Sequence, residues 1–112
     1  MAERRAKRFQ PAGPITVGFL GTNTRFRGEL VDISSTGILI RCSQELEPGT
    51  MGRLGFELGQ EVVRIVVVAR RRIPGLGMAF EFRRMTSRDR QMLHRLLYRL
   101  AQLCPSESRA TA

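Results

Sequence analysis

Two short polar segments hold the residues of this sequence whose types and spacing could do chemistry. The first is the run Asp-Ile-Ser-Ser-Thr-Gly from Asp32 to Gly37, which interrupts two apolar stretches. A glycine such as Gly37 suits a backbone with positive φ or a close approach of another segment, because a Cβ resists both. A flat polar ligand could lie against the backbone there. Taken alone, however, the run is more typical of a hairpin whose Asp and Ser side chains bond only their own main chain.

The second segment is a basic arm at the N-terminus, residues 1–13. Arg4 and Arg8 stand four residues apart, and Arg5 follows Arg4 directly. A helical turn, or an extended arm that folds back, would bring two or three of these guanidinium groups onto one small anion. The arm has too little apolar surface to fold alone. A basic terminus of this kind is, on its own, more typical of a solvated tail.

The composition favours an anionic partner. The chain has 112 residues, enough for one domain with a modest core, and its formal net charge is +9. Lys7 is the only lysine, so almost all of the positive charge is arginine. The planar guanidinium fork meets phosphate, or the acceptor edge of guanine, through paired hydrogen bonds and can stack on a base. We expect a cytoplasmic protein without membrane insertion, because no apolar run approaches the roughly 18 residues that span a bilayer and the charged N-terminus lacks the apolar segment of a signal peptide.

Apolar and polar residues alternate along most of the chain, and turns marked by Gly and Pro separate the alternating segments. Alternation with period two is typical of strands that bury one face. The segments expected as strands are residues 15–20, 25–33, 37–42, 52–58, 61–73 and 76–82. The β-branched run within 61–73 suggests a strand covered on both faces or a barrel stave. Six short strands with tight turns favour a mainly β fold, a small antiparallel β-barrel.

The period changes to that of a helix after the last strand. Thr86 or Ser87 is a typical cap, and Asp89 would lie in the first turn near the positive end of the helix dipole. The apolar face of this helix consists of Met92, Leu93, Leu96, Leu97, Leu100 and Leu103. We expect this face to close one mouth of the barrel or to pack on its side, in preference to a dimer seam or a membrane surface. The expected organisation is thus the arm, a barrel with its C-terminal helix over residues 14–104, and a disordered tail over 105–112, in a monomer or weak dimer.

The sequence does not assemble a catalytic or metal centre. His94 is the only histidine, and its helical spacing points it away from the leucine face, so no catalytic triad forms around it. Cys42 and Cys104 have no scaffold-like spacing and are expected as reduced thiols. With His94 they make a poor metal site, because no close-spaced pair of ligands starts it. No glycine-rich phosphate-binding loop is present either, and we expect a protein that is not an enzyme and that has no metal or cofactor.

The two polar segments together resemble the motifs of the PilZ domain. Residues 4–8, Arg-Arg-Ala-Lys-Arg, are similar to the family's Arg-x-x-x-Arg arm, and residues 32–37 are similar to its Asp-x-Ser-x-x-Gly turn. Residues 76–80, Leu-Gly-Met-Ala-Phe, look like the family's Val-Gly-Val-x-Phe strand, and a terminal helix opens near Ser87. The resemblance covers almost the whole chain. It implies a six-stranded, split β-barrel that binds the second messenger cyclic di-GMP and acts as its effector in motility, surface polysaccharide or biofilm control.

The resemblance also implies roles for individual residues. The implied ligand-binding residues are Arg4, Arg5, Arg8, Asp32, Ser34 and Gly37. The arginines of the arm would bind the phosphates and the O6/N7 edge of guanine, and Asp32 would accept from the guanine donor edge or hold an arginine in place. Ser34 would add a hydroxyl, and Gly37 would keep the turn low. The arm should be mobile without ligand and ordered with it, a change that would signal to a protein partner.

Two places in the sequence leave the shape of this site open. Ser35 and Thr36 stand where many PilZ domains carry a smaller or glycine-containing pair, which could narrow the pocket. The cluster Arg70, Arg71 and Arg72 could add a ligand arginine, although a solvated strand end is the favoured interpretation.

Two alternative functions also stay open. The chain could be a PilZ-like domain that has become a protein interaction module without a ligand, although its motifs are intact. It could also be a small basic barrel that binds RNA or DNA. Against the second alternative, most aromatic residues fall on the inward parity of their strands, which leaves few for the exposed stacking platform of single-strand binders.

Overall fold

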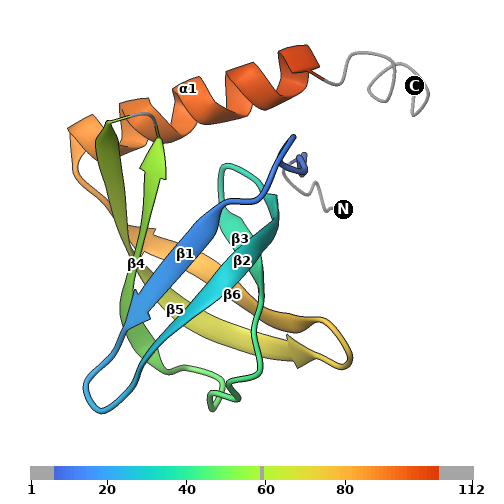
Figure 1. Cartoon of the computed structure of the whole chain (residues 1–112). Helices are drawn as coiled ribbons and strands as arrows, with labels where there is room; N and C mark the ends of the chain where they lie inside the picture. The colour runs from blue at the N-terminus through green and yellow to red at the C-terminus, as the bar shows by residue number, and fades with distance from the viewer. Residues whose placement is uncertain (1–6, 59, 104–112) are drawn as a thin grey trace, which may run out of the picture.

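The structure is a computed structural model, and it describes residues 7–58 and 60–103. Within these residues, six antiparallel strands form a closed barrel in the order β1-β2-β3-β6-β5-β4, and one helix follows (Figure 1). The elements are β1 (Thr16–Leu20), β2 (Arg25–Ile33), β3 (Gly37–Arg41), β4 (Met51–Leu58), β5 (Glu61–Ile73), β6 (Gly77–Arg84) and α1 (Ser87–Leu103). The predicted mainly β fold, a six-stranded antiparallel barrel with a C-terminal helix, is confirmed.

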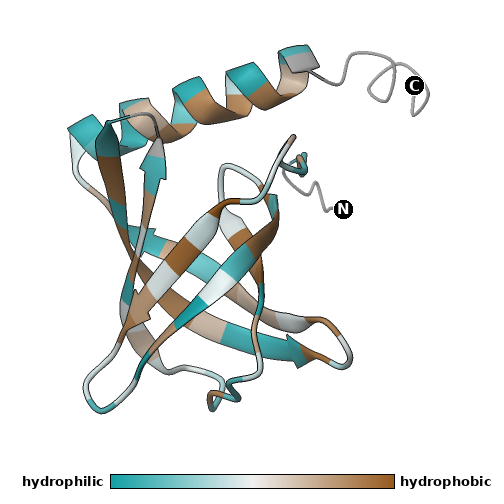
Figure 2. Ribbon diagram, in the orientation of Figure 1, coloured by the Kyte–Doolittle hydropathy of each residue, from teal (hydrophilic) through white to brown (hydrophobic). Residues whose placement is uncertain are grey.

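Alternation along the strands fills the inside of the barrel with apolar side chains. Phe19 of β1 lies in this core, with its ring centre 5.0 Å from that of Phe26 and 5.4 Å from that of Phe80. Apolar and polar bands succeed one another along the strands in Figure 2. The β-branched run of β5 is a barrel stave, because Val63, Ile65 and Val67 are all buried in the same core.

Register shifts in the strand pairing change which residues face outward, and two of the three shifts among the described residues determine the directions of Asp32 and Arg71. The register of β2 against β3 shifts between Leu30 and Asp32, and that of β5 against β6 shifts between Ala69 and Arg71. An extra residue in one strand reverses the alternation beyond it. Leu30 and Ile33 are therefore both buried, and Asp32 points outward although it shares the parity of Leu30.

The strand ends differ slightly from those expected. β6 begins at Gly77, one residue late, because Leu76 belongs to the preceding turn, in which its N–H donates to the Ile73 carbonyl at 2.9 Å and Gly75 has a φ of 76°. β3 ends at Arg41 and β4 begins at Met51, each one residue earlier than expected.

Helix α1 begins with a reciprocal cap and closes one mouth of the barrel. The N–H of Asp89 donates to Thr86 Oγ1 at 3.0 Å, and the Thr86 hydroxyl donates to Asp89 Oδ2 at 2.8 Å, so Thr86 rather than Ser87 is the cap. The buried apolar face joins the barrel core through Met92, Leu93, Leu96 and Leu100, and α1 lies across the end of the barrel (Figure 1). This is one of the two predicted placements. Over the described ranges, no helix has the length and apolarity to cross a membrane.

Candidate functional site

Ser34 holds the turn between β2 and β3 together. Its side chain is fully buried, and its Oγ accepts hydrogen bonds from the backbone N–H groups of Thr36 and Gly37, each at 3.1 Å. The backbone closes the same turn, since Ser34 N–H donates to the Gly37 carbonyl at 2.9 Å. These contacts aim the Ser34 hydroxyl into the turn. Ser34 therefore shapes the site from below and does not present its hydroxyl at the surface.

Gly37 is required because another strand approaches it closely. A Cβ at this position would stand 2.7 Å from the carbonyl oxygen of Phe80 on β6, closer than real Cβ atoms come. The two segments are also bonded, because Phe82 N–H donates to the Thr36 carbonyl at 2.9 Å. Of the two reasons predicted for Gly37, close approach is confirmed. Positive φ is wrong, since it occurs at Gly49 and Gly75 and not at Gly37.

Arg8 of the arm and Asp32 of β2 form the charged centre of the site. Arg8 Nε donates to Asp32 Oδ1 at 2.6 Å, and the two side chains are 43% and 20% exposed. The backbone fixes the arm at this point, because Phe9 N–H donates to the Ile33 carbonyl at 2.8 Å and Ile33 N–H donates to the Phe9 carbonyl at 2.9 Å. The described end of the arm is thus anchored to β2, whereas the sequence predicted an arm that is loose over all of residues 1–13.

Strand register places Arg71 on the same wall of the barrel as Asp32. Asp32 lies opposite Leu39, Leu39 opposite Ala79 and Ala79 opposite Arg71, in a row across β2, β3, β6 and β5. Residues paired in this way share one face of the sheet. With about 4.8 Å between neighbouring strands, the row is about 14 Å long when it is followed around the surface of the barrel. We call the outer surface of β3 and β6 between the two ends of this row the Asp32 wall.

Of the three neighbouring arginines on β5, Arg71 is free to bind an anion at the Asp32 wall. Arg70 pairs with Glu81 at 3.6 Å, and Arg72 pairs with Glu45. In the described part of the chain, no carboxylate lies within 4.0 Å of the Arg71 side chain. Glu81 lies opposite Gly37, so the Arg70–Glu81 pair borders the turn.

The structure brings together four of the six predicted site residues, Arg8, Asp32, Ser34 and Gly37. Arg4 and Arg5 lie outside the described residues. The site has the guanidinium group of Arg8 and the carboxylate of Asp32 at one edge, a low backbone in the middle, and the guanidinium group of Arg71 at the far edge. This arrangement suits a ligand that has anionic groups and polar base edges. Sequence reasoning favoured a solvated strand end for Arg71, because the bulge after Ala69, which sets the direction of its side chain, is formed by pairing with β6.

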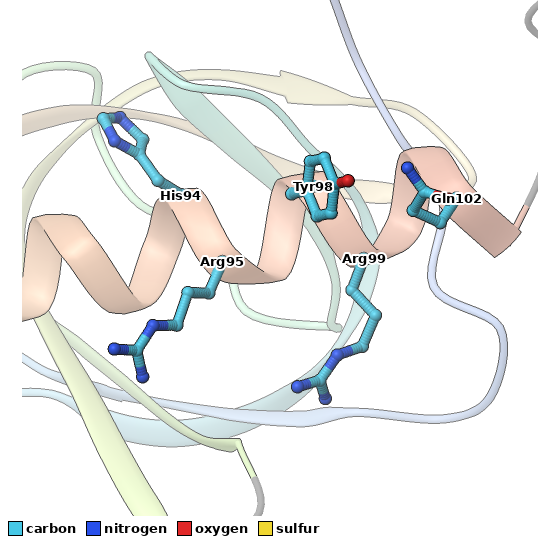
Figure 3. A pocket seen from close by; sticks show the side chains of 5 residues that line it. All are labelled: His94, Arg95, Tyr98, Arg99 and Gln102. Atoms are coloured by element: carbon cyan, nitrogen blue, oxygen red, sulfur yellow. The ribbon is translucent and has the colours of Figure 1, made fainter.

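The remaining candidate groups belong to other parts of the fold. His94 is exposed on α1, where it lines a surface hollow of about 610 Å³ together with Arg95, Tyr98, Arg99 and Gln102 (Figure 3). In that view Arg95 and Arg99 extend to one side of the helix and His94 to the other. Cys42 is half-buried just after β3, and burial raises the pKa of its thiol above the ordinary value. Cys104 lies outside the described residues.

Comparison with known families places the chain. Its sequence matches the PilZ domain over residues 2–99. The chain therefore belongs to the PilZ domain family, as its motifs indicated. PilZ domains are receptor and effector modules rather than enzymes. A comparison with curated proteins found no match.

Two solved structures share the fold. The PilZ domain of YcgR from Escherichia coli, solved with c-di-GMP, has a TM-score of 0.69 and 19% identity over 96% of this chain and 98% of that one. The Bacillus subtilis inhibitor of motility, MotI/DgrA, has a TM-score of 0.65 and 18% identity over 98% of this chain and 54% of that one. The chain thus spans about half the length of the B. subtilis protein. At these identities the likeness establishes the fold.

Proposed function

We propose that this PilZ domain binds cyclic di-GMP between its N-terminal arm and the Asp32 wall, and that binding is relayed to a protein partner. The observation that carries the proposal is the contact between Arg8 and Asp32, made where Phe9 and Ile33 exchange backbone hydrogen bonds. The contact joins the two motifs that the sequence keeps 24 residues apart. The E. coli PilZ domain solved with c-di-GMP supports the choice of ligand.

The chemistry of the ligand matches the groups at this wall. Cyclic di-GMP presents two phosphates and two guanines, so a binder needs cations for phosphate and for the O6/N7 edge. Arg8, with Arg4 and Arg5 of the same arm, would supply them at one edge. Asp32 would hold Arg8 in position, as it does here, or accept from the guanine donor edge. Ser34 and Gly37 would keep the turn low beneath the ligand.

Arg71 extends the proposed site to the far edge of the wall. It shares the outward row of Asp32 and has no carboxylate within 4.0 Å in residues 7–58 and 60–103. A row about 14 Å long around the barrel surface leaves room for a ligand larger than a mononucleotide. Arg71 would bind a phosphate or stack on a purine face.

The signal would start at the Arg8–Asp32 contact. The contact with Asp32 uses Arg8 Nε, so a phosphate bound by the other nitrogens of the same guanidinium group would fix the arm over the ligand and change the contacts of the arm. A partner that recognises the altered arm would read the ligand concentration. The B. subtilis inhibitor of motility supports a role in motility, and surface polysaccharide or biofilm control are alternatives for a cytoplasmic effector of this kind.

Calorimetric titration with cyclic di-GMP tests the proposal. Arg8→Ala, Asp32→Ala and Arg71→Ala should each weaken binding by about tenfold or more, because each removes a charge-assisted contact. Arg90→Ala is the matched control: Arg90 is exposed on α1, and its loss should change the affinity less than twofold. Cyclic di-AMP, which has the phosphates without the guanine edges, should give no heat. Absence of heat with native protein and cyclic di-GMP, or full binding by both Arg8→Ala and Asp32→Ala, would contradict the proposal.

A further inference from the structure

A pair of glycines faces outward on the wall formed by β1 and β4. Gly18 of β1 lies opposite Gly55 of β4, and the same row continues to Arg27 of β2 on one side and Arg64 of β5 on the other. The two arginines are thus separated by two strands that carry no side chain at this level. With about 4.8 Å per strand, the row from Arg27 to Arg64 is about 14 Å long around the surface of the barrel.

The fold does not require glycine at these two positions. A Cβ on Gly18 would have its nearest neighbour at 4.0 Å, and one on Gly55 at 3.8 Å, which are ordinary contacts. Neither residue has a positive φ. Glycine in a strand interior loses packing and conformational entropy, so its use without a steric reason marks a place where something else approaches the backbone closely.

The surface around the glycines carries more basic than acidic side chains, with Glu57 and Glu29 at its margin. A second row of outward-facing residues lies two residues away along each strand. It runs from Arg25 through Leu20, Arg53 and Val66 to Arg84. All five arginines of the two rows are exposed, and among the described residues no carboxylate lies within 4.0 Å of their side chains. By contrast, the arginines of the Glu29–Arg41, Glu81–Arg70 and Glu61–Arg88 pairs are neutralised.

This surface is also hollowed, and it carries apolar side chains. A hollow of about 400 Å³ lies beside Leu20, Gly52 and Arg53, and a second of about 650 Å³ lies beside Arg27, Gly55 and Glu57. Leu20 is 52% exposed and Met51 48% exposed. We call this surface, from the Gly18–Gly55 row to Met51, the β1–β4 trough. Glu57 and Glu29 end its positive region toward the α1 side.

The trough and the Asp32 wall lie on opposite sides of the barrel. In the closed order β1-β2-β3-β6-β5-β4, the pair β1 and β4 stands across the ring from the pair β3 and β6. We propose that the β1–β4 trough is the docking surface for an acidic, extended segment of a protein partner. Carboxylates of the segment would pair with the arginine rows, its backbone would lie over Gly18 and Gly55, and an apolar side chain would contact Leu20 and Met51.

Charge and shape favour this occupant over three others. A second copy would bring the same arginines face to face, and like charges oppose such an interface. A single-stranded nucleic acid would need exposed aromatic residues to stack on, and the exposed aromatic residue in the described part of the chain is Tyr98, on α1. A bilayer surface is flat and would not enter a hollow that is floored by backbone. An acidic peptide is narrow enough to lie over Gly18 and Gly55, between Arg27 and Arg64.

The assignment deepens the proposed function, because it gives the protein partner a place to bind while the ligand occupies the other wall. It rests on the proposed function for the existence of that partner, and the binding of an acidic peptide can be tested without the ligand. The two can fail separately. The probe for the trough is a synthetic, fluorescein-labelled peptide, Glu-Leu-Asp-Glu-Leu-Asp-Glu, whose binding is followed by fluorescence anisotropy without cyclic di-GMP. The ligand site is followed by calorimetry with the same protein samples.

Three variants address the trough directly. Arg27→Gln and Arg64→Gln should each weaken peptide binding by about tenfold through loss of a charge-assisted contact. Gly55→Val should abolish peptide binding while raising Tm by about 2–6 °C, because valine suits a strand and the position has room for it. This combination of higher stability with lost binding separates a docking role from a structural one. All three variants should bind cyclic di-GMP as the native protein does.

The controls decide whether the effect belongs to the trough. Arg90→Gln on α1 removes the same charge elsewhere and should change peptide affinity less than twofold, and Arg8→Ala should leave it unaltered. The proposal is overturned if the peptide shows no saturable binding, or if Arg90→Gln weakens peptide binding as much as Arg64→Gln does. It is also overturned if Gly55→Val binds the peptide as tightly as the native protein. A fourth contrary result is that an oligothymidylate or phosphatidylglycerol vesicles bind more tightly than the peptide and depend on Arg64 in the same way. If peptide binding follows the prediction and cyclic di-GMP gives no heat, the proposed ligand is wrong and the trough assignment stands.

Discussion

At the scale of single residues, the site depends on a bulge in β2. Strict alternation would put Asp32 on the parity of Phe26 and Leu30, inside the barrel, where an unpaired carboxylate is very costly. The register shift between Leu30 and Asp32 turns the side chain outward, where Arg8 meets it. Since both side chains are partly exposed, we expect this ion pair to add only about 0–1 kcal/mol to the free energy of unfolding. Its value lies in placing the arm over the turn.

Ser34 should matter for stability more than for direct contact with a ligand. Ser34→Ala leaves the N–H groups of Thr36 and Gly37 without their buried acceptor, which should lower the free energy of unfolding by about 1–3 kcal/mol. Urea denaturation followed by circular dichroism measures this loss. Ser35→Ala is the matched control, because the Ser35 side chain is exposed and its removal should change stability by less than about 0.5 kcal/mol. Equal stability of Ser34→Ala and Ser35→Ala would show that the hydroxyl does not hold the turn.

At the scale of elements, the cap of α1 also ties the helix to the barrel. Asp89 bonds the cap residue Thr86 and accepts the backbone N–H of Arg64 on β5 at 3.3 Å. Its side chain is 9% exposed, so these donors have little access to water. The helix start is therefore coupled to a central barrel strand.

Removal of the two cap residues should have graded effects on thermal stability. Thr86→Ala should cost about 1 kcal/mol, the usual loss for an N-cap. Asp89→Ala should cost about 2–3 kcal/mol, because it also leaves the Arg64 N–H unpaired. Ser87→Ala, at the alternative cap position, is the control and should change Tm little. Calorimetric unfolding compares the three, and a loss in Ser87→Ala as large as that in Thr86→Ala would contradict this assignment of the cap.

The elements were predictable from the sequence because each has a clear period. Alternation gave the six strands, and the leucine spacing gave α1 with its buried face. Strand ends were off by one where turn chemistry competes with alternation, as at Leu76 beside Gly75, and β6 runs two residues beyond the expected Phe82. The site was accessible only in part. The acidic turn and the basic arm were recognisable as motifs, but the bulges at Asp32 and Arg71 depend on long-range pairing that one sequence does not encode locally.

At the scale of the whole molecule, two positive surfaces divide the barrel. The Asp32 wall combines positive charge with a carboxylate at the turn, and the β1–β4 trough combines a glycine floor with arginines that pair with no carboxylate of residues 7–58 and 60–103. The two stand across the closed ring from each other, so a small anion and a protein segment can be bound together. The net charge of +9 would attract either from a distance.

Salt dependence should separate a dinucleotide receptor from a nucleic-acid binder. Cyclic di-GMP carries two phosphates, so the slope of log K against log salt should be no steeper than about −2 per ligand bound. A barrel that neutralised six or more phosphates of a polymer would give a slope of about −5 or steeper. Titrations at several salt concentrations, with cyclic di-GMP and with an oligonucleotide, give both slopes. Tight oligonucleotide binding with the steep slope, and no binding of cyclic di-GMP, would favour the nucleic-acid alternative.

The central claim is that cyclic di-GMP lies between the arm and the Asp32 wall, and the most direct measurement is a two-dimensional NMR titration of the ¹⁵N-labelled protein with this ligand. The largest amide shift changes should fall on Phe9, Ile33, Gly37, Arg71 and Ala79, which line the two edges and the floor of that wall. The amides of Gly18 and Gly55, across the barrel, should not move. Saturable shifts at Gly18 and Gly55, with none at the turn or the arm, would contradict the account.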